Sequence, residues 1–178
     1  MAYMNNVKEQ LQKAIEQLND FCNCFNSTEK KIALACDYFR WVRQKTQMIM
    51  DEDTFQEPKA ADLKRGSVCW IHFGFNVGEE FGGKHPGIVL RKGGKTIVVV
   101  PLTTKQPTQK QLESGTYVEV DKVFGFKRMT RWVNVLNMTP VSIQRIDYNS
   151  DFGDVKGYVL DNITTAIMES GLLGRSSS

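Results

Sequence analysis

The sequence predicts an α+β protein, with a helical N-terminal segment, a small antiparallel β domain and a C-terminal helix. Its hydrophobic residues first recur every three to four positions and, beyond about residue 60, fall into alternating or short continuous runs. These runs are short and closely connected, which favours a small barrel or sandwich over a parallel α/β sheet. A content of 41% hydrophobic residues in 178 is typical of a globular protein and excludes disordered and fibrous classes.

Two helices are predicted before residue 51. Apolar residues between positions 6 and 25 follow the spacing of one helix face. Residues 26–29 (Asn-Ser-Thr-Glu) then provide a helix-cap signal, and a second apolar series runs from Ile32 to Ile49. The acidic and polar run at 51–59 is typical of a linker. We therefore expect three parts: a helical extension with its linker at 1–60, a β domain at 61–174 and a disordered tail at 175–178.

Five strands are expected after the linker, because five segments are rich in Val, Ile and aromatic residues. They are residues 67–73, 87–92, 96–102, 116–120 and 132–136. Gly93 and Gly94 lie between two of them and predict a tight hairpin turn, since paired glycines accept positive φ. A last helix is expected at about residues 154–170, and Gly171 would end it.

The composition also limits the compartment and the cofactor class. No stretch approaches the roughly 20 apolar residues that a membrane-spanning helix needs, and the N-terminus lacks a signal-peptide layout. We expect a cytoplasmic protein that does not enter membranes. Cys22, Cys24 and Cys36 could form a partial metal site, but their irregular spacing favours buried free thiols. We therefore expect neither a metal nor another cofactor.

The net charge of +3 is unevenly spread. Ten basic but only three acidic residues fall between Lys84 and Arg131. This imbalance suits a face that binds a polyanion, although a solvated lysine-rich surface would look the same.

Residues 78–86 form the best candidate site. We interpret this segment, Gly-Glu-Glu-Phe-Gly-Gly-Lys-His-Pro, as a loop between two strands. Its glycines would let backbone N–H groups approach a ligand, and it concentrates two carboxylates, an ammonium and an imidazole. A plain strand connection with solvated charges is the alternative. At the end of a later apolar strand, Thr103 and Lys105 could hold a phosphate oxygen, or could simply terminate the strand.

The segment at residues 124–132 mixes cations and aromatic rings. Such a pattern fits single-stranded nucleic acid, because bases stack on rings while phosphates meet cations. Core packing of Phe124 and Trp132 is the alternative.

Three motifs in order resemble the PemK/MazF toxin family. Residues 64–71 (KRGSVCWI), 77–90 (VGEEFGGKHPGIVL) and 98–104 (VVVPLTT) are similar to the family patterns RGDIVWV, VGSEQGGxRPALVL and VVVPLTS. The similarity extends over roughly residues 63–170. It implies an SH3-like antiparallel barrel, of the type shared with CcdB-like toxins, that forms a homodimer, cleaves single-stranded RNA without a metal and is inhibited by an antitoxin protein.

The resemblance also implies which residues act. In the family, an arginine before the motif proline and a threonine or serine after Pro-Leu act at the scissile phosphate. The matching positions are His85 and Thr103, so the threonine is kept and the arginine is replaced. Histidine can carry a proton near neutral pH. Lys84 could add positive charge, and Glu80 could orient His85, act as a base or simply bond its own loop.

The RNA strand is expected to contact Lys105, Lys127, Arg128, Arg131 and Trp132. Asn137 roughly matches a polar family position, but its surroundings depart from the family pattern and we assign it no catalytic role. Two other functions stay open, a non-catalytic binding barrel and a topoisomerase-directed toxin. The N-terminal helices could pack on the barrel, extend a dimer interface or cover the RNA groove.

Overall fold

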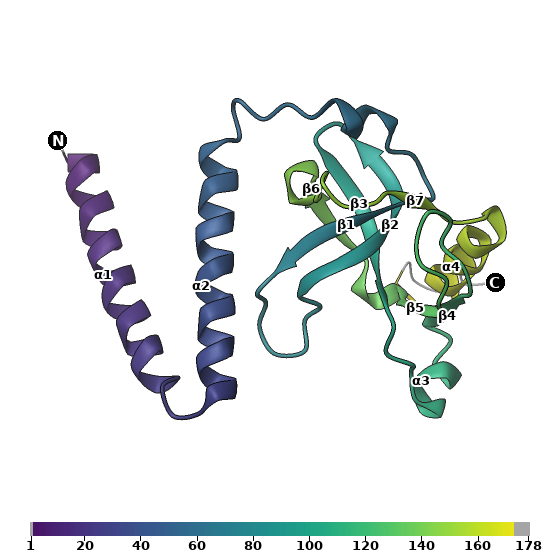
Figure 1. The fold of residues 1–178 in the computed structure, drawn as a ribbon, viewed down its shortest axis with the longest axis horizontal. Coiled ribbons are helices and arrows are strands. Elements are labelled where there is room, and N and C mark those ends of the chain that lie inside the picture. The colour runs from purple at the N-terminus through teal and green to yellow at the C-terminus, as the bar shows by residue number, and fades with distance from the viewer. Residues whose placement is uncertain (1, 173–178) are drawn as a thin grey trace. The chain divides into compact units, whose positions relative to one another are not determined.

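The computed structural model describes residues 2–172, which divide into two compact units with the boundary between Asp51 and Glu52 (Figure 1). The expected tail at 175–178 lies outside the described residues. Within the described part, no helix is both long and apolar enough to cross a membrane.

The first unit consists of the two predicted helices. Helix α1 spans Ala2–Cys24 and α2 spans Glu29–Met50. Thr28 caps α2, because its side chain accepts a hydrogen bond from the Lys31 backbone N–H at 3.3 Å. Both helix predictions are confirmed.

The cysteines differ from the expectation of buried thiols. Cys22, Cys24 and Cys36 are exposed on the helices, and Cys69 is buried in the β domain. The prediction was wrong for the first three because a two-helix unit offers little interior in which to bury them. Among residues 2–172, no group of three or more His, Cys, Asp or Glu side chains is placed to hold a metal ion.

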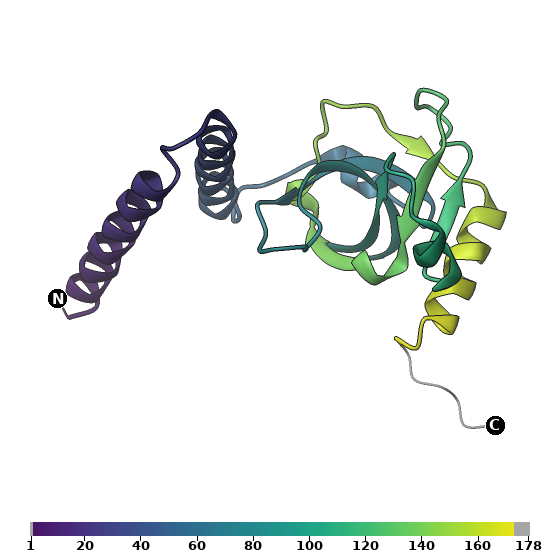
Figure 2. The same cartoon turned by 90° about the horizontal axis from the view of Figure 1, so that it is seen from below.

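The second unit is a curled antiparallel sheet with a C-terminal helix, as predicted. Its strands are β1 (Ser67–Gly74), β2 (Gly83–Gly93), β3 (Thr96–Thr103), β4 (Tyr117–Val120), β5 (Arg131–Asn134), β6 (Thr139–Ser142) and β7 (Gly153–Asp154). The strand order is β4-β5-β3-β2-β1-β7, and β6 also pairs with β3. After β6, which pairs with β3, the chain returns to β1. There Ile146 bridges to Ile71 and the Asp147 N–H donates to the Trp70 carbonyl at 2.8 Å, so the sheet closes into a small barrel (Figure 2).

All five strand predictions are confirmed, and the smallest elements were missed. Strands β6 and β7 and the short helix α3 (Gln109–Glu113) carry no clear hydrophobic period over their few residues. The predicted strand at 132–136 ends at Asn134, whose side chain accepts from the Leu136 N–H at 3.1 Å and starts a 3₁₀ turn. The last helix, α4 (Gly157–Glu169), begins three residues later than expected because residues 153–154 pair with β1.

The central strands are buried on both faces. Side chains alternate along a strand, so each strand contributes to two clusters. One cluster lies between the sheet and α4 and includes Val68, Ile88, Val100, Leu102, Val159 and Ile163. The other includes Cys69, Ile71, Phe73, Val89, Ile97, Val99, Val141 and Ile143. Burial on both faces explains why β3 reads as a continuous apolar run.

Gly153 joins the β4–β5 loop to the barrel, and we expect Gly153→Ala to be destabilising. The Phe124 N–H donates to the Asp154 carbonyl at 2.9 Å, and the Asp154 N–H returns a bond to the Phe124 carbonyl at 3.1 Å. A methyl group on residue 153 would press on that Phe124 carbonyl and lie 2.9 Å from the Phe126 ring. Loss of both hydrogen bonds should lower the free energy of unfolding by about 2 kcal/mol.

Urea denaturation measures this change. Gly157→Ala is the matched control, because its added methyl group meets no atom within 4 Å. We expect Gly157→Ala to be neutral or slightly stabilising, since alanine restricts the unfolded chain. Equal urea midpoints for the two variants would contradict the prediction.

Candidate functional site

The predicted site loop is shorter than expected. Strand β2 begins at Gly83, so Lys84 and His85 are strand residues that pair with His72 and Ile71 of β1. The interpretation of all of 78–86 as a loop was therefore wrong. A Gly-Gly-Lys-His segment has no strand signal of its own, and its pairing is set by the adjacent edge of β1.

The strand places Lys84 and His85 on opposite faces of the sheet, because successive side chains alternate. Lys84 forms an ion pair with Asp147, donates to the Ser150 hydroxyl at 3.4 Å and lies 5.7 Å from the Trp70 ring centroid. Hydrogen bonds from Lys84 and Ser150 hold the pKa of the Asp147 carboxyl well below its usual range. Lys84 thus belongs to a structural cluster on the face of the sheet opposite to His85.

His85 and Thr103 lie at the same end of neighbouring strands. The β2–β3 register pairs Gly87 with Pro101. His85 and Thr103 are each two residues beyond that pair, so their side chains point to the same face. The row continues across the sheet, because Thr103 pairs with Trp132. Trp132 in turn pairs with Glu119 of β4.

We call His85, Thr103, Trp132 and Glu119 the catalytic row, because His85 and Thr103 are the two catalytic residues that the family resemblance leads us to expect. The row faces away from the α4 core, since the alternate residues Leu102 and Val133 are buried in that core. Glu119 is exposed and the other three are partly exposed.

The environment of His85 favours its neutral form. Its ring contacts the Phe81 ring edge-on, with 4.8 Å between centroids. Partial burial lowers the pKa of the His85 imidazole from its ordinary value of 6.5, because the charged form loses hydration. A neutral imidazole at neutral pH can accept a proton. The Thr103 hydroxyl oxygen accepts the Lys105 N–H at 3.1 Å, which leaves the hydroxyl proton available to an anion.

Glu80 lies in the β1–β2 loop, beside the residue that contacts His85. Its carboxylate accepts the Val77 N–H at 3.2 Å, so it bonds its own loop. It also lines a cleft of about 590 Å³ together with Phe81, Asn137 and Arg145. Sequence reasoning missed Arg145, whose guanidinium donates to the Phe73 carbonyl at 2.9 Å. No local motif marks this arginine, because its position comes from a pairing far along the chain.

The predicted RNA contacts divide into exposed and buried groups. Lys105, Lys127 and Arg128 are exposed, and Trp132 belongs to the catalytic row. Arg131 is buried, with only 5% of its surface exposed. Its guanidinium donates to the Met129 and Lys127 carbonyls at 3.2 Å each, so it holds the β4–β5 loop closed.

The aromatic rings of that loop also take different places. Phe124 is 37% exposed, so core packing, the alternative for this ring, was wrong. Phe126 instead stacks on Trp70, with 6.1 Å between ring centroids.

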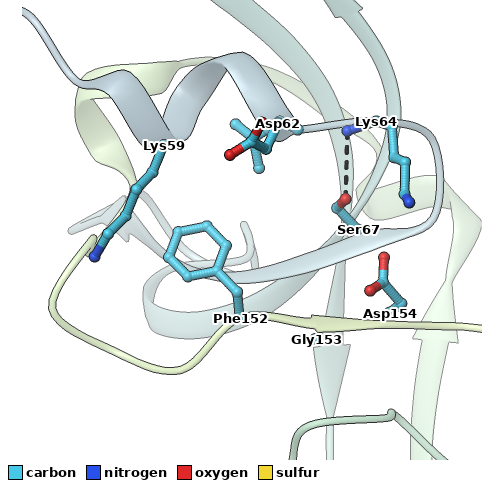
Figure 3. A pocket seen from close by; sticks show the side chains of 8 residues that line it. Lys59, Asp62, Lys64, Ser67, Phe152, Gly153 and Asp154 are labelled. Carbon is cyan, nitrogen blue, oxygen red and sulfur yellow. Dashed lines mark hydrogen bonds between the residues drawn. The ribbon is translucent and has the colours of Figure 1, made fainter.

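A second cavity of about 410 Å³ lies at the start of β1 (Figure 3). Its polar walls include Lys59, Asp62, Lys64 and Asp154, and Phe152 projects between them. Lys59 donates to the Tyr148 carbonyl at 3.1 Å. Because His85, Thr103 and Glu80 are not among its lining residues, this cavity is separate from the catalytic row.

Comparison with known proteins places the β domain in a family. The model of the PemK-like, MazF-like toxin of type II toxin-antitoxin systems matches residues 64–171. No curated protein sequence matches the chain.

Three solved structures are similar to part of the chain. MazF (Form-I) from Deinococcus radiodurans is 17% identical, with a TM-score of 0.48, over 62% of this chain and 94% of that one. The Mycobacterium tuberculosis toxin MazF-mt6 is 16% identical, with a TM-score of 0.43, over 58% of this chain and 93% of that one. MazE-MazF (Form-II) from Deinococcus radiodurans is 17% identical, with a TM-score of 0.43, over 62% and 94%. Because the family model covers more than half of the sequence, the chain belongs to the PemK-like, MazF-like toxins of type II toxin-antitoxin systems.

Proposed function

We propose that this toxin is an endoribonuclease that cleaves single-stranded RNA at the catalytic row without a metal ion. The observation that carries the proposal is the placement of His85 and Thr103 on one accessible face, at the same end of β2 and β3. When a ribose hydroxyl attacks its neighbouring phosphodiester, it needs a proton acceptor, and a hydroxyl donor on the same face can stabilise the charge that develops.

The reaction can be written with these residues. Neutral His85 takes the proton from the ribose 2′-hydroxyl, and the 2′-oxygen forms a bond to phosphorus. The bond from phosphorus to the 5′-oxygen breaks, and the leaving oxygen takes a proton from water. Thr103 donates a hydrogen bond to a non-bridging phosphate oxygen as negative charge builds up there. The products are a 2′,3′-cyclic phosphate and a 5′-hydroxyl.

The residues around the catalytic row suit the binding of an extended RNA strand. Trp132 is partly exposed next to Thr103 and offers a ring on which a base can stack. The exposed cations Lys105, Lys127 and Arg128 can meet phosphates along the path. Arg131 supports this path indirectly, through the shape of the loop that carries Lys127. Lys84 has no part in the proposed reaction, because it lies on the opposite face of β2.

Family membership supports the remaining features of the proposal. A toxin of a type II system has a protein antitoxin, so we expect an antitoxin protein as the inhibitor. We also expect a homodimer that acts in the cytoplasm, with the helical extension at 1–60 outside the domain at 61–174.

The test uses purified full-length protein and a labelled single-stranded RNA in EDTA, with the ends of the products mapped. Cyclic-phosphate and 5′-hydroxyl ends are expected. One observation favours a second function, since the family arginine is replaced by His85. RNA that is bound but left intact would therefore indicate a non-catalytic binding barrel. DNA damage in cells without RNA loss would instead favour the topoisomerase-directed alternative.

Thr103→Ala is expected to reduce the cleavage rate by about 10²-fold, the cost of removing one donor that stabilises transition-state charge. RNA binding should change far less, because the hydrogen bond strengthens only as charge develops. Single-turnover cleavage and filter binding measure the two quantities. Thr104→Ala is the control, because it removes the same hydroxyl and methyl groups from an exposed residue that follows the end of β3 and is not part of the row. Equal losses in the two variants would remove Thr103 from the mechanism.

A further inference from the structure

The N-terminal helical unit buries very little apolar surface of its own. Among its described side chains, Ala35 alone is buried. The aromatic contacts gather near the turn, where Phe21 lies 4.3 Å from Phe25, 4.8 Å from Tyr38 and 5.8 Å from Phe39 between ring centroids. Helices in water depend on burial of their apolar face for most of their stability. The rest of this unit therefore needs a partner surface.

That need is greatest along α1. Beyond the turn, α1 and α2 separate in both views (Figures 1 and 2). Met4, Val7, Leu11 and Ile15 follow a three-and-four spacing along one face of α1. They leave 62, 61, 59 and 42% of their surfaces exposed. Scattered exposed apolar residues are ordinary, but a continuous stripe of them marks an interaction surface.

The apolar residues of the stripe are spaced symmetrically about Leu11. Val7 and Ile15 lie four residues to either side of Leu11, and Met4 and Leu18 lie seven residues to either side. If two copies of α1 cross antiparallel with Leu11 opposite Leu11, Val7 of each copy faces Ile15 of the other. Met4 then faces Leu18. A two-fold contact requires this kind of self-complementarity, and the spacing suits knobs-into-holes packing.

The charge of the unit also fits a second copy. Residues 2–51 contain seven Lys or Arg and six Asp or Glu, a net charge of +1. Glu9 and Lys13 pair with each other at 2.6 Å, away from the stripe. Two copies would therefore repel each other little, whereas neither RNA nor a strongly acidic peptide would be attracted.

We propose that α1 is a self-association surface, and that its partner is α1 of a second copy in an antiparallel pair centred on Leu11. The surface lies outside the family domain at 64–171, so it adds an interface to whatever contacts the β domain makes. The proposal does not depend on RNA cleavage.

The first test measures the mass of the full-length chain by light scattering over a range of concentrations. Leu11→Glu places a charge in the centre of the stripe and removes the α1 contact, so the assembly should dissociate at a higher protein concentration than that of the unchanged protein. Asn5→Glu adds the same charge to α1 outside the stripe, and its mass should match that of the unchanged protein. A mass for Leu11→Glu that falls at the same concentration as the mass of the unchanged protein would overturn the proposal.

Disulfide crosslinking tests the geometry directly, even if Leu11→Glu unfolds α1. In a background with Cys22, Cys24 and Cys36 replaced by serine, Leu11→Cys should form covalent dimers under mild oxidation. Val7→Cys alone should not, but a mixture of Val7→Cys and Ile15→Cys chains should. Only monomers for Leu11→Cys would indicate that the stripe closes on its own chain, and dimers of Val7→Cys alone would indicate a parallel pair. Either result would overturn the proposal.

Discussion

Replacing His85 with alanine is expected to reduce RNA cleavage by about 10²- to 10⁴-fold, the usual contribution of a positioned proton carrier. RNA binding should persist, because the imidazole is neutral at neutral pH and contributes little charge to phosphate contacts. His72→Ala is the matched control. His72 pairs with Lys84 in the β1–β2 register, on the face opposite to His85, and its removal should leave the rate within about threefold.

The pH dependence separates a proton carrier from a structural residue. Burial lowers the pKa of His85 below 6.5, so the basic form persists to lower pH. The cleavage rate should be constant above that pKa and should fall as the pH drops through it, with a midpoint below 6.5. The same fall of the cleavage rate at low pH should be seen in His72→Ala. His85→Arg carries the residue that the family resemblance implies, and any remaining activity of this variant should not show the fall at low pH. A rate that does not fall at any pH below 6.5 at which the protein stays folded would exclude His85 as the base.

Replacing Ile163 with alanine is expected to lower the free energy of unfolding of the β domain by about 2–5 kcal/mol, the range for deleting a large buried aliphatic side chain. Ile163 is fully buried in the cluster between α4 and the sheet, which also holds Val68, Val100 and Val159. These neighbours belong to two strands and a helix turn that cannot all collapse into the space left by the side chain. Ile163→Ala should therefore lower the free energy of unfolding at least as much as Gly153→Ala.

Urea denaturation followed by tryptophan fluorescence measures this effect. A Trp41→Phe background restricts the signal to Trp70 and Trp132 of the β domain, because Trp41 lies on α2. Thr165→Ala, an exposed position on the same helix, should be nearly neutral. If both variants unfold at the same urea concentration, α4 does not contribute to the stability of the barrel.

The sequence alone determined the local elements and the candidate chemistry. The spacing of apolar residues located both long helices and five strands, and Gly94, with φ of +63°, occupies the predicted hairpin turn. The order of three motifs pointed to the family and to the positions of His85 and Thr103. These signals work because helix periodicity, strand alternation and glycine turns depend on residues only a few positions apart.

Tertiary structure decided which of those residues lie together. Lys84 and His85 are neighbours in sequence, but the pairing of β2 with β1 sends them to opposite faces, and Lys84 meets Asp147, 63 residues away. Arg131 looks like an RNA contact in a basic segment, yet its guanidinium is buried on the carbonyls of its own loop. Strand register and the burial of a side chain follow from contacts between distant segments, and a local pattern does not encode them. The sequence therefore determined the candidate catalytic residues, and the folded sheet decided that His85, Thr103 and Trp132 share a face.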